Sequence, residues 1–256
     1  MNYRGIAFFD LDGTLLNENS QVSSAVANGI DRLRDNQILP VIATGRTEAE
    51  IPQILNDTKI TSNIVMNGSF IRVNGEIIHR EIIDKTTIEK MLQLTKENQQ
   101  PLAFYNHSNY WATQHNDDLV NAYQYIHSQL PEINPNAYLE REVNMLLVLG
   151  QDKDETYHVA FPELTFYRNG PYSIDIVKKN VSKGQAVRKL IEILQLENVP
   201  TYGFGDGLND LALLEACDYK IAMGNAKKEL KEMADFITLT NQEDGIVHAL
   251  KTFDLI

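Results

Sequence analysis

The sequence predicts an α/β protein built on a doubly wound parallel sheet, with a smaller α+β unit inserted in the middle of the chain. Three observations lead to this prediction. Strand-like and helix-like patterns alternate near both ends of the 256 residues, which is typical of a parallel sheet covered by helices on both faces. The middle of the chain instead pairs neighbouring strands. It also holds twelve of the 21 aromatic residues, so the middle is expected to form a unit of a different kind.

The first 80 residues are expected to supply one half of the parallel sheet. Apolar runs that predict strands and amphipathic runs that predict helices follow one another over 4–10, 22–37, 38–44, 44–57 and 63–66. Thr47 and Glu50 have the spacing of a capping box at the start of the second helix. Asn74-Gly75 lies between two apolar, β-branched runs and predicts a hairpin.

Residues 82–178 are expected to form the inserted α+β unit. Its strands are predicted as two adjacent pairs and one single strand: 101–106 with 109–113, 163–168 with 172–177, and 144–150. Helices are predicted near 85–99 and 117–130. Residues 1–81 and 179–256 would then form one domain.

The end of the chain returns to the alternating pattern. Val187, Leu190, Ile191 and Leu194 form an apolar stripe at helical spacing. Strands and helices that alternate are then predicted over 200–205, 208–216, 219–223, 226–234, 235–238 and 242–252. The core sheet should therefore receive strands from both ends of the chain.

Composition limits the possible partners. The net charge of −12 argues against nucleic acid or an anionic membrane, because such surfaces need clustered cations. No apolar run approaches the roughly 20 residues of a membrane helix. Cys217 is the only cysteine, so no internal disulfide can form. We therefore expect a cytoplasmic monomer or homodimer whose partner is a small molecule.

Acidic and small polar residues follow three of the predicted parallel strands. They are Asp10 after the first strand, Thr44 and Gly45 after the second, and Asp206, Asn209 and Asp210 after the strand over 200–205. In open parallel sheets, ligands bind outside the carboxyl ends of the strands. The joint placement of these residues at one edge predicts a functional site there.

The residue types at this edge favour phosphoryl chemistry. Aspartates that meet at one edge repel one another unless a cation lies among them, and an all-oxygen site suits Mg²⁺. Lys183 adds a positive charge at a predicted helix start, where backbone N–H groups are free to bind an anion. A metal, a lysine, a threonine hydroxyl and N–H donors together describe a pocket for a phosphoryl group.

Asp10 and Asp12 are spaced for two different roles. If the chain stays extended through both, their carboxylates project from the same side of the backbone. One could attack phosphorus as a nucleophile, while the other manages the proton of the leaving group. Gly13 permits a sharp turn and a close approach of the backbone to phosphate.

Each motif also has a simpler interpretation. Asp-Gly after a strand is common in turns, and Ser182-Lys183 could simply begin a helix. An EF-hand is disfavoured because Gly13 stands fourth, not sixth, from Asp10. The run GFGDG lacks the correctly spaced third glycine of a dinucleotide fingerprint. The predicted functional site therefore requires that the fold bring these motifs together at one edge of the sheet.

Four segments resemble the ordered motifs of the haloacid dehalogenase (HAD) superfamily: "DLDGTLL", "ATGR", "VSKG" and "GDGLND". The tail "IAMGNAKKELKEMADFITLTNQEDGI" is similar to the Cof-type subgroup of sugar-phosphatase-like hydrolases. The resemblance implies a Rossmann-like, HAD-like core with a large α+β cap at 82–178. Leu208 departs from the fourth motif, which usually has an acidic residue there.

The resemblance implies roles for the charged residues. Asp10 would be the nucleophile and Asp12 the general acid/base. Asp10, the backbone carbonyl of Asp12 and Asp206 would hold Mg²⁺. Asp210 would support the metal site or orient Lys183, which would neutralise charge on the nucleophile and the phosphate.

The resemblance also implies where phosphate and substrate bind. Thr44 and Gly45 would contact phosphoryl oxygens, and Asn209 the phosphoryl group or the metal shell. Asn67-Gly68 resembles a substrate-proximal loop. Cap residues that could contact substrate are Trp111, Tyr105, His107, His115, Arg168 and Asp175, although cap aromatics are expected mostly to fill the cap's own core.

The predicted function is that of a Mg²⁺-dependent phosphatase. It would hydrolyse a small soluble phosphomonoester, such as a sugar phosphate or a phosphorylated cofactor, through an aspartyl-phosphate. One alternative is a phosphomutase on the same fold, which would return the phosphoryl group to its substrate. Another is a regulatory protein that keeps its aspartyl-phosphate, although the cap and Asp12 would then have no purpose. A binding module without catalysis is disfavoured by the intact set of motifs.

Overall fold

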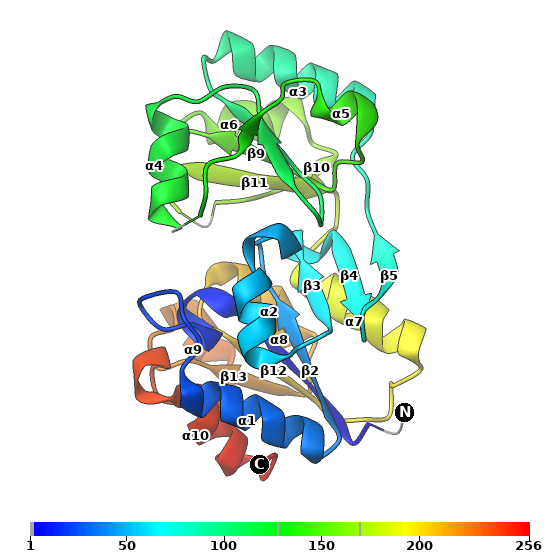
Figure 1. Cartoon of the computed structure of the whole chain (residues 1–256), viewed down its shortest axis with the longest axis vertical. Coiled ribbons are helices and arrows are strands. Elements are labelled where there is room, and N and C mark those ends of the chain that lie inside the picture. The colour runs from blue at the N-terminus through cyan, green and yellow to red at the C-terminus, as the bar shows by residue number, and fades with distance from the viewer. Residues whose placement is uncertain (1–2, 127, 169) are drawn as a thin grey trace.

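Two β-sheets organise the molecule, as the computed structural model shows (Figure 1). The structure describes residues 3–126, 128–168 and 170–256. The first sheet is built from strands at the two ends of the chain: β1 (Gly5–Phe9), β2 (Ile38–Ala43), β3 (Asn63–Val65), β4 (Phe70–Val73), β5 (Glu76–Arg80), β12 (Thr201–Gly205), β13 (Tyr219–Ala222) and β14 (Phe236–Ile237).

The strand order shows that this sheet is doubly wound. It runs β14-β13-β12-β1-β2-β3-β4-β5, and the pairs from β14 to β3 are parallel. The chain moves outward from β1 to β3, then returns to place β12 on the other side of β1. The hairpin predicted at Asn74-Gly75 is formed by β4 and β5, which pair antiparallel. The predicted α/β fold class is confirmed.

Helices cover the first sheet in two groups. They are α1 (Ser24–Asp35), α2 (Pro52–Thr58), α7 (Lys183–Leu194), α8 (Leu211–Glu215), α9 (Lys228–Met233) and α10 (Gly245–Thr252). Helix α1 packs against α2 and α10, and α7 packs against α8. Because β1 and β2 lie between covering helices, every residue of these two strands is buried.

Several predicted helices differ from the structure in their bounds, and three of them show why. The segment 44–57 contains a short 3₁₀ turn, η2 (Glu48–Glu50), and then α2, which begins at Pro52 because proline lacks the N–H that a helix interior needs. The helix expected over 117–130 ends at Tyr125. The one expected over 242–252 starts only at Gly245, after Asp244 adopts a left-handed φ of 53°.

The second sheet is α+β in character. Its strands are β6 (Leu102–Tyr105), β7 (Tyr110–Ala112), β8 (Glu132–Ile133), β9 (Met145–Leu149), β10 (Leu164–Tyr167) and β11 (Ser173–Lys178). Their order is β10-β11-β9-β6-β7-β8, and every pair except β7–β8 is antiparallel. The helices that accompany them are α3 (Lys85–Glu97), α4 (Asp117–Tyr125), α5 (Ala137–Glu140) and α6 (Asp154–Ala160).

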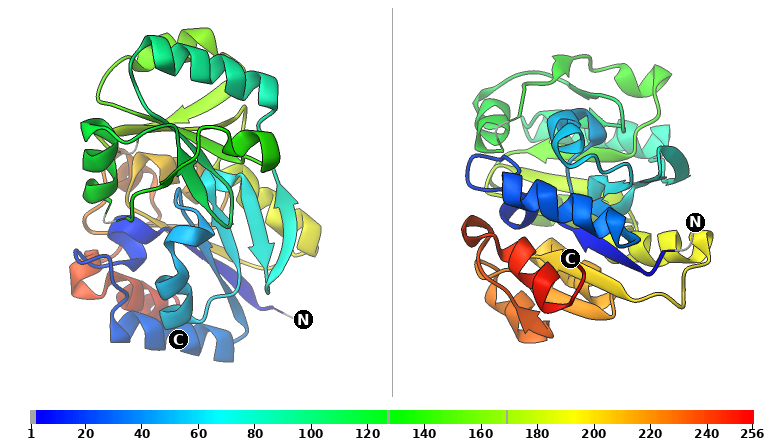
Figure 2. Two further views of the ribbon diagram at one scale, coloured as in Figure 1. Left: turned by 45° about the horizontal axis from the view of Figure 1, so that its top comes forward. Right: turned by 60° about the horizontal axis from the view of Figure 1, so that its bottom comes forward.

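The two faces of the second sheet have different neighbours. One face packs with α3, α5 and α6 in a separate core, which contains Phe104, Leu146, Ile174 and Ile176. In Figure 1 and in the left view of Figure 2, α3 lies on the side away from the first sheet. The residues that alternate with these point the other way, because side chains alternate along a strand. The second sheet therefore turns one face toward the first sheet.

No helix in the described ranges is both long and apolar enough to cross a membrane.

Candidate active site

The site lies where the first sheet changes direction, between β1 and β12. At such a switch point the connections leave the two strands on opposite sides, which opens a crevice at their carboxyl ends. Asp10 directly follows β1, and its N–H donates to the carbonyl of Phe204 on β12 (3.0 Å). A single π-helical turn, η1 (Leu11–Leu15), then turns the chain away, with Gly13 at a φ of 81°.

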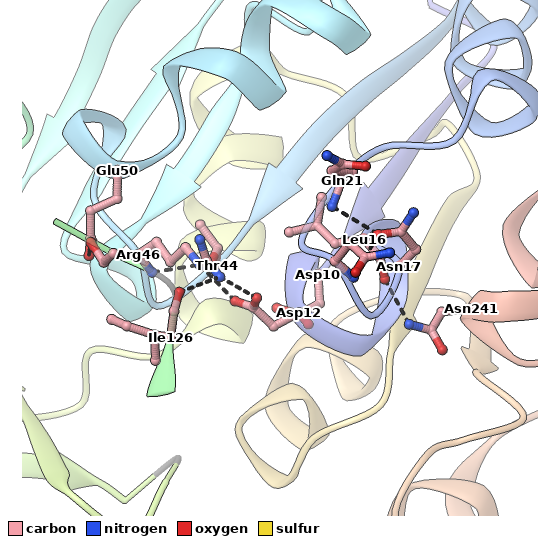
Figure 3. Close-up of polar contacts among 12 residues, drawn as sticks. Asp10, Asp12, Leu16, Asn17, Gln21, Thr44, Arg46, Glu50, Ile126 and Asn241 are labelled. Carbon is pink, nitrogen blue, oxygen red and sulfur yellow. Dashed lines mark hydrogen bonds and ion pairs between the residues drawn. The ribbon is translucent and has the colours of Figure 1, made fainter. Parts of the chain in front are cut away.

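Residues from the far end of the chain hold this turn in place. The side-chain amides of Asn225 and Asn241 donate to the carbonyls of Gly13 and Leu16, each at 2.7 Å. The Asn241 contact is visible in Figure 3. The Thr14 hydroxyl donates to the carboxylate of Asp206 (3.0 Å). Both ends of the chain are therefore needed to fix the position of Asp10.

Lys183 joins two buried carboxylates. Its Nζ donates to Oδ1 of Asp10 at 2.6 Å and to Oδ1 of Asp210 at 2.7 Å. Lys183 is 1 % exposed and Asp210 is completely buried. Ser182 caps α7 by accepting the N–H of Gln185 (3.1 Å), so Lys183 is the first residue of a well-defined helix. Asp210, predicted to support the metal site or to orient Lys183, thus lies in direct contact with Lys183.

Asp210 also fixes the loop that follows β12. Its Oδ2 accepts the N–H groups of Asp206 and Gly207, both at 3.0 Å. One carboxylate thus holds the lysine on one side and the backbone that carries Asp206 on the other. Oxygen atoms of Asp10, Asp206 and Asp210 lie within 4.8 Å of one another.

Burial and repulsion perturb these groups. Burial, followed by the charge of Asp210, raises the pKa of Asp10 well above its usual value. The same two causes raise the pKa of Asp206 to about 6. Burial opposes the charge on Lys183, but Asp10 and Asp210 together raise its pKa. The cluster therefore carries more negative charge than Lys183 alone compensates.

A divalent cation fits this cluster. The three side chains offer only carboxylate oxygens, which Mg²⁺ prefers. A cation among them would offset both the burial and the repulsion that raise the pKa of Asp206. Among the residues that the structure describes, this cluster consists of the carboxylates of Asp10, Asp206 and Asp210. The Asp12 carboxylate is not part of it.

The Asp12 carboxylate points to Arg46 instead (Figure 3). Arg46 donates from Nε to Oδ2 of Asp12 (2.8 Å) and from Nη2 to Oδ1 (2.5 Å), and Nη2 also reaches the carbonyl of Ile126 (3.4 Å). Because the turn η1 begins at Leu11, the chain does not stay extended from Asp10 through Asp12. Sequence reasoning assigned no role to Arg46. Its position directly after Thr44 and Gly45, in the same motif, could have indicated that Arg46 belongs to the site.

The residues expected to bind phosphate border the same space. Thr44 is buried, and its hydroxyl oxygen accepts the N–H of Arg46 (3.1 Å). Gly45 follows it, and Asn209 lies in the 3₁₀ turn η4 (Leu208–Asp210). Thr44, Gly45 and Asn209 line a cavity of about 760 Å³ together with Asp10, Asp12 and Asp206.

The second sheet forms the opposite wall of this cavity. Its lining side chains include Tyr105, Met145, Leu147, Arg168 and Asp175. Trp111, also considered from the sequence, belongs to the separate core of the second sheet. His107 stacks on Phe70, and the His115 ring lies 2.8 Å from the carbonyl of Pro131. A ligand in the cavity would therefore contact both sheets.

Comparison with known proteins identifies the family. The model for haloacid dehalogenase-like hydrolases matches residues 7–250. YkrA of Bacillus subtilis (strain 168) is 32 % identical over 252 residues, which cover 98 % of each chain. Phosphatase YwpJ of the same organism is 28 % identical, covering 94 % of this chain and 97 % of its own.

Solved structures agree. A protein of Geobacillus kaustophilus HTA426 superposes with a TM-score of 0.92 at 27 % identity, over 100 % of both chains. The HAD subclass IIB sugar phosphatase BT4131 gives 0.87 at 26 %, covering 98 % of this chain and 100 % of its own. The chain belongs to the haloacid dehalogenase-like hydrolase family. It is a HAD-type hydrolase of the phosphatase class, and such hydrolases generally use a divalent metal.

Proposed function

We propose that the enzyme is a Mg²⁺-dependent phosphatase that hydrolyses a small phosphomonoester through an aspartyl-phosphate on Asp10. The observation that carries the proposal is the buried contact of Lys183 with Asp10 and Asp210. Asp10 and the neighbouring Asp206 line the cavity. Residues 1–81 and 179–256 would form the hydrolase core, and 82–178 the cap that contacts the leaving group.

Asp10 carries the covalent step. Its carboxylate oxygen forms a bond to phosphorus while the bond between phosphorus and the ester oxygen breaks. Asp12 gives its proton to that ester oxygen, so the alcohol leaves neutral. Asp12 then takes a proton from water, whose oxygen attacks the aspartyl-phosphate, and inorganic phosphate leaves as the Asp10 carboxylate is restored.

The remaining residues bind the phosphoryl group or compensate negative charge. Lys183 compensates charge on Asp10 and on the phosphoryl group, whose oxygens would be held by Thr44, Gly45 and Asn209. Asp10, Asp206 and the backbone carbonyl of Asp12 would hold Mg²⁺, with Asp210 in support. When bound, the metal supplies positive charge to the phosphoryl oxygens.

The size of the cavity and the names of the relatives support a small metabolite as substrate. YcsE of Bacillus subtilis (strain 168) is 28 % identical to this chain, covers 94 % of it, and is named a 5-amino-6-(5-phospho-D-ribitylamino)uracil phosphatase. BT4131 is titled a sugar phosphatase. Both names describe a phosphate ester on a small hydroxylated molecule.

Two parallel experiments test the proposal: the variant Asp10→Asn, and treatment of the wild-type enzyme with the metal chelator EDTA. We expect Asp10→Asn to lose at least about 1000-fold in phosphate release from p-nitrophenyl phosphate, because the amide is a poor nucleophile. EDTA should abolish release, and added Mg²⁺ should restore it. Asp152→Asn changes an exposed cap residue and should retain full activity. Activity that survives either Asp10→Asn or EDTA would refute the mechanism.

Asp12→Ala tests the proton-transfer role separately. An alkyl phosphate needs a proton on its leaving oxygen, whereas p-nitrophenolate leaves without one. We expect kcat to fall about 10- to 100-fold more for glycerol 3-phosphate than for p-nitrophenyl phosphate. Equal losses on both substrates would show that Asp12 is not the acid.

A further inference from the structure

Lys227 lies at the opening of the cavity and takes no part in the proposed catalytic steps. Its side chain is exposed and lines the cavity. Leu208 and Asp12 line the same cavity, and they are 54 % exposed and, for the Asp12 side chain, 55 % exposed. Exposed residues that border a cavity mark its opening. A substrate that enters through this opening therefore meets the charge of Lys227.

The backbone that carries Lys227 is fixed to the strands of the site. The Lys227 N–H donates to the carbonyl of Asp206 at 2.9 Å. Two residues earlier, the side chain of Asn225 donates to the carbonyl of Gly13 (2.7 Å) and accepts the N–H of Asn241 (3.0 Å). The loop after β13 is thus tied to the loops after β1 and β12. It places Lys227 at the edge of the sheet that carries the site.

The charges that line the cavity work against an anionic substrate. Acidic side chains outnumber basic ones in this lining: they are Asp10, Asp12, Glu50, Asp175 and Asp206, against Arg46, Arg168 and Lys227. The whole chain carries a net charge of −12. A phosphomonoester is mostly a dianion at neutral pH, so the field of the protein opposes its approach. A cation at the opening would offset this repulsion.

The other two cations of the lining are bound to carboxylates. Arg46 donates to both oxygens of Asp12, and Arg168 donates to both oxygens of Asp154. Within residues 3–126, 128–168 and 170–256, no oxygen atom forms a hydrogen bond or an ion pair with the ammonium group of Lys227. The positive charge of Lys227 is therefore available to an incoming anion.

We propose that Lys227 attracts the phosphate dianion of the substrate into the cavity and strengthens its binding there. This inference rests on the proposed phosphatase function and adds a binding residue on the loop after β13. Because Lys227 is exposed, its attraction acts through water, where salt screens charges over roughly 10 Å at 0.1 M ionic strength. The contribution of Lys227 should therefore be large at low ionic strength and small at high ionic strength.

Inorganic phosphate and the variant Lys227→Gln test this inference. The substitution removes the charge and keeps the backbone N–H that contacts Asp206. We expect the Kd of inorganic phosphate, measured by isothermal titration calorimetry with Mg²⁺, to rise about 3- to 10-fold at roughly 20 mM ionic strength. At roughly 0.5 M the rise should be less than about twofold. KM for p-nitrophenyl phosphate should rise in the same proportion, and Lys227→Arg, which keeps the charge, should restore both values.

Lys228→Gln is the matched control, because it changes the net charge by the same amount. The Lys228 side chain is 85 % exposed, its Nζ lies 3.5 Å from Oε1 of Glu232, and it does not line the cavity. We expect it to change the Kd of phosphate by less than about 1.5-fold at either ionic strength.

Three results would overturn the inference: an unchanged Kd in Lys227→Gln, equal effects of Lys227→Gln and Lys228→Gln, or an effect of Lys227→Gln that is the same at both ionic strengths. The last result would indicate a structural role, since salt does not screen a packing defect. If instead wild-type enzyme with Mg²⁺ releases no phosphate from p-nitrophenyl phosphate, the phosphatase function itself is wrong.

Discussion

At the scale of single residues, the feature that most needs compensation is the burial of the charged ammonium group of Lys183. Removing a charge from water costs several kcal/mol, and only close partners of opposite charge compensate for it. Lys183 has two, Asp10 at 2.6 Å and Asp210 at 2.7 Å. The same contacts that make the buried charge tolerable also orient Asp10, the proposed nucleophile.

The variant Lys183→Met tests how far the stability of the protein depends on these contacts of Lys183. Methionine fills a similar volume but leaves two buried carboxylates without their cation, so we expect a loss of about 3–5 kcal/mol in the free energy of unfolding. Urea denaturation monitored by circular dichroism measures it. Lys228→Met, at a side chain that is 85 % exposed, should change stability by less than about 0.5 kcal/mol. A Lys183→Met protein as stable as wild type would contradict the argument.

At the scale of elements, the packing of α7 on α8 sets the distance between Lys183 and Asp210. Gly184 makes this packing possible, because a Cβ there would lie 2.0 Å from the backbone carbonyl oxygen of Ala212. Sequence reasoning predicted both helices from their apolar patterns. It gave no reason why the second residue of α7 must be glycine, since that depends on Ala212, which lies in another helix and far along the chain.

Gly184→Ala should therefore separate the two helices. We expect a loss of about 1–3 kcal/mol in stability, because backbone cannot move aside cheaply, and a lower kcat because Lys183 shifts with the helix. The control is Gly29→Ala in α1, where the new Cβ would meet its nearest atom at 3.5 Å. That change should be neutral or stabilising, since alanine favours helices. Thermal unfolding and phosphate release measure both effects; equal behaviour of the two variants would refute the packing argument.

At the scale of the whole molecule, the segment that follows β2 connects the two sheets. The Thr47 hydroxyl donates to the carbonyl of Asn106 (2.5 Å), and the Ser128 hydroxyl donates to Glu50 (3.1 Å). Glu50 also accepts the N–H of Thr47 (2.9 Å), as the predicted capping spacing suggested. These contacts begin directly after Thr44 and Gly45. The approach of the second sheet is thereby linked to the shape of the proposed phosphate site.

Thr47→Val combined with Ser128→Ala should weaken the approach of the second sheet without disturbing either core. We expect KM for a phosphomonoester to rise about 3- to 10-fold, because closing over the ligand becomes less favourable, while the melting temperature changes little. Thr252→Val loses a hydroxyl bond within α10 instead and should leave KM unchanged. An unchanged KM in the double variant would show that these bonds do not contribute to closure.

The sequence by itself determined the alternating fold, the hairpin at Asn74-Gly75, and the presence of acids after β1 and β12, because periodicity and chain order are local properties. Only the tertiary structure decided which groups meet. Lys183 contacts Asp10 across 173 residues, Arg46 contacts Asp12 across 34, and Asn67 contacts Asp175 across 108. Such pairings depend on how sheets and helices pack and on where a turn redirects the chain. No local pattern encodes those distances.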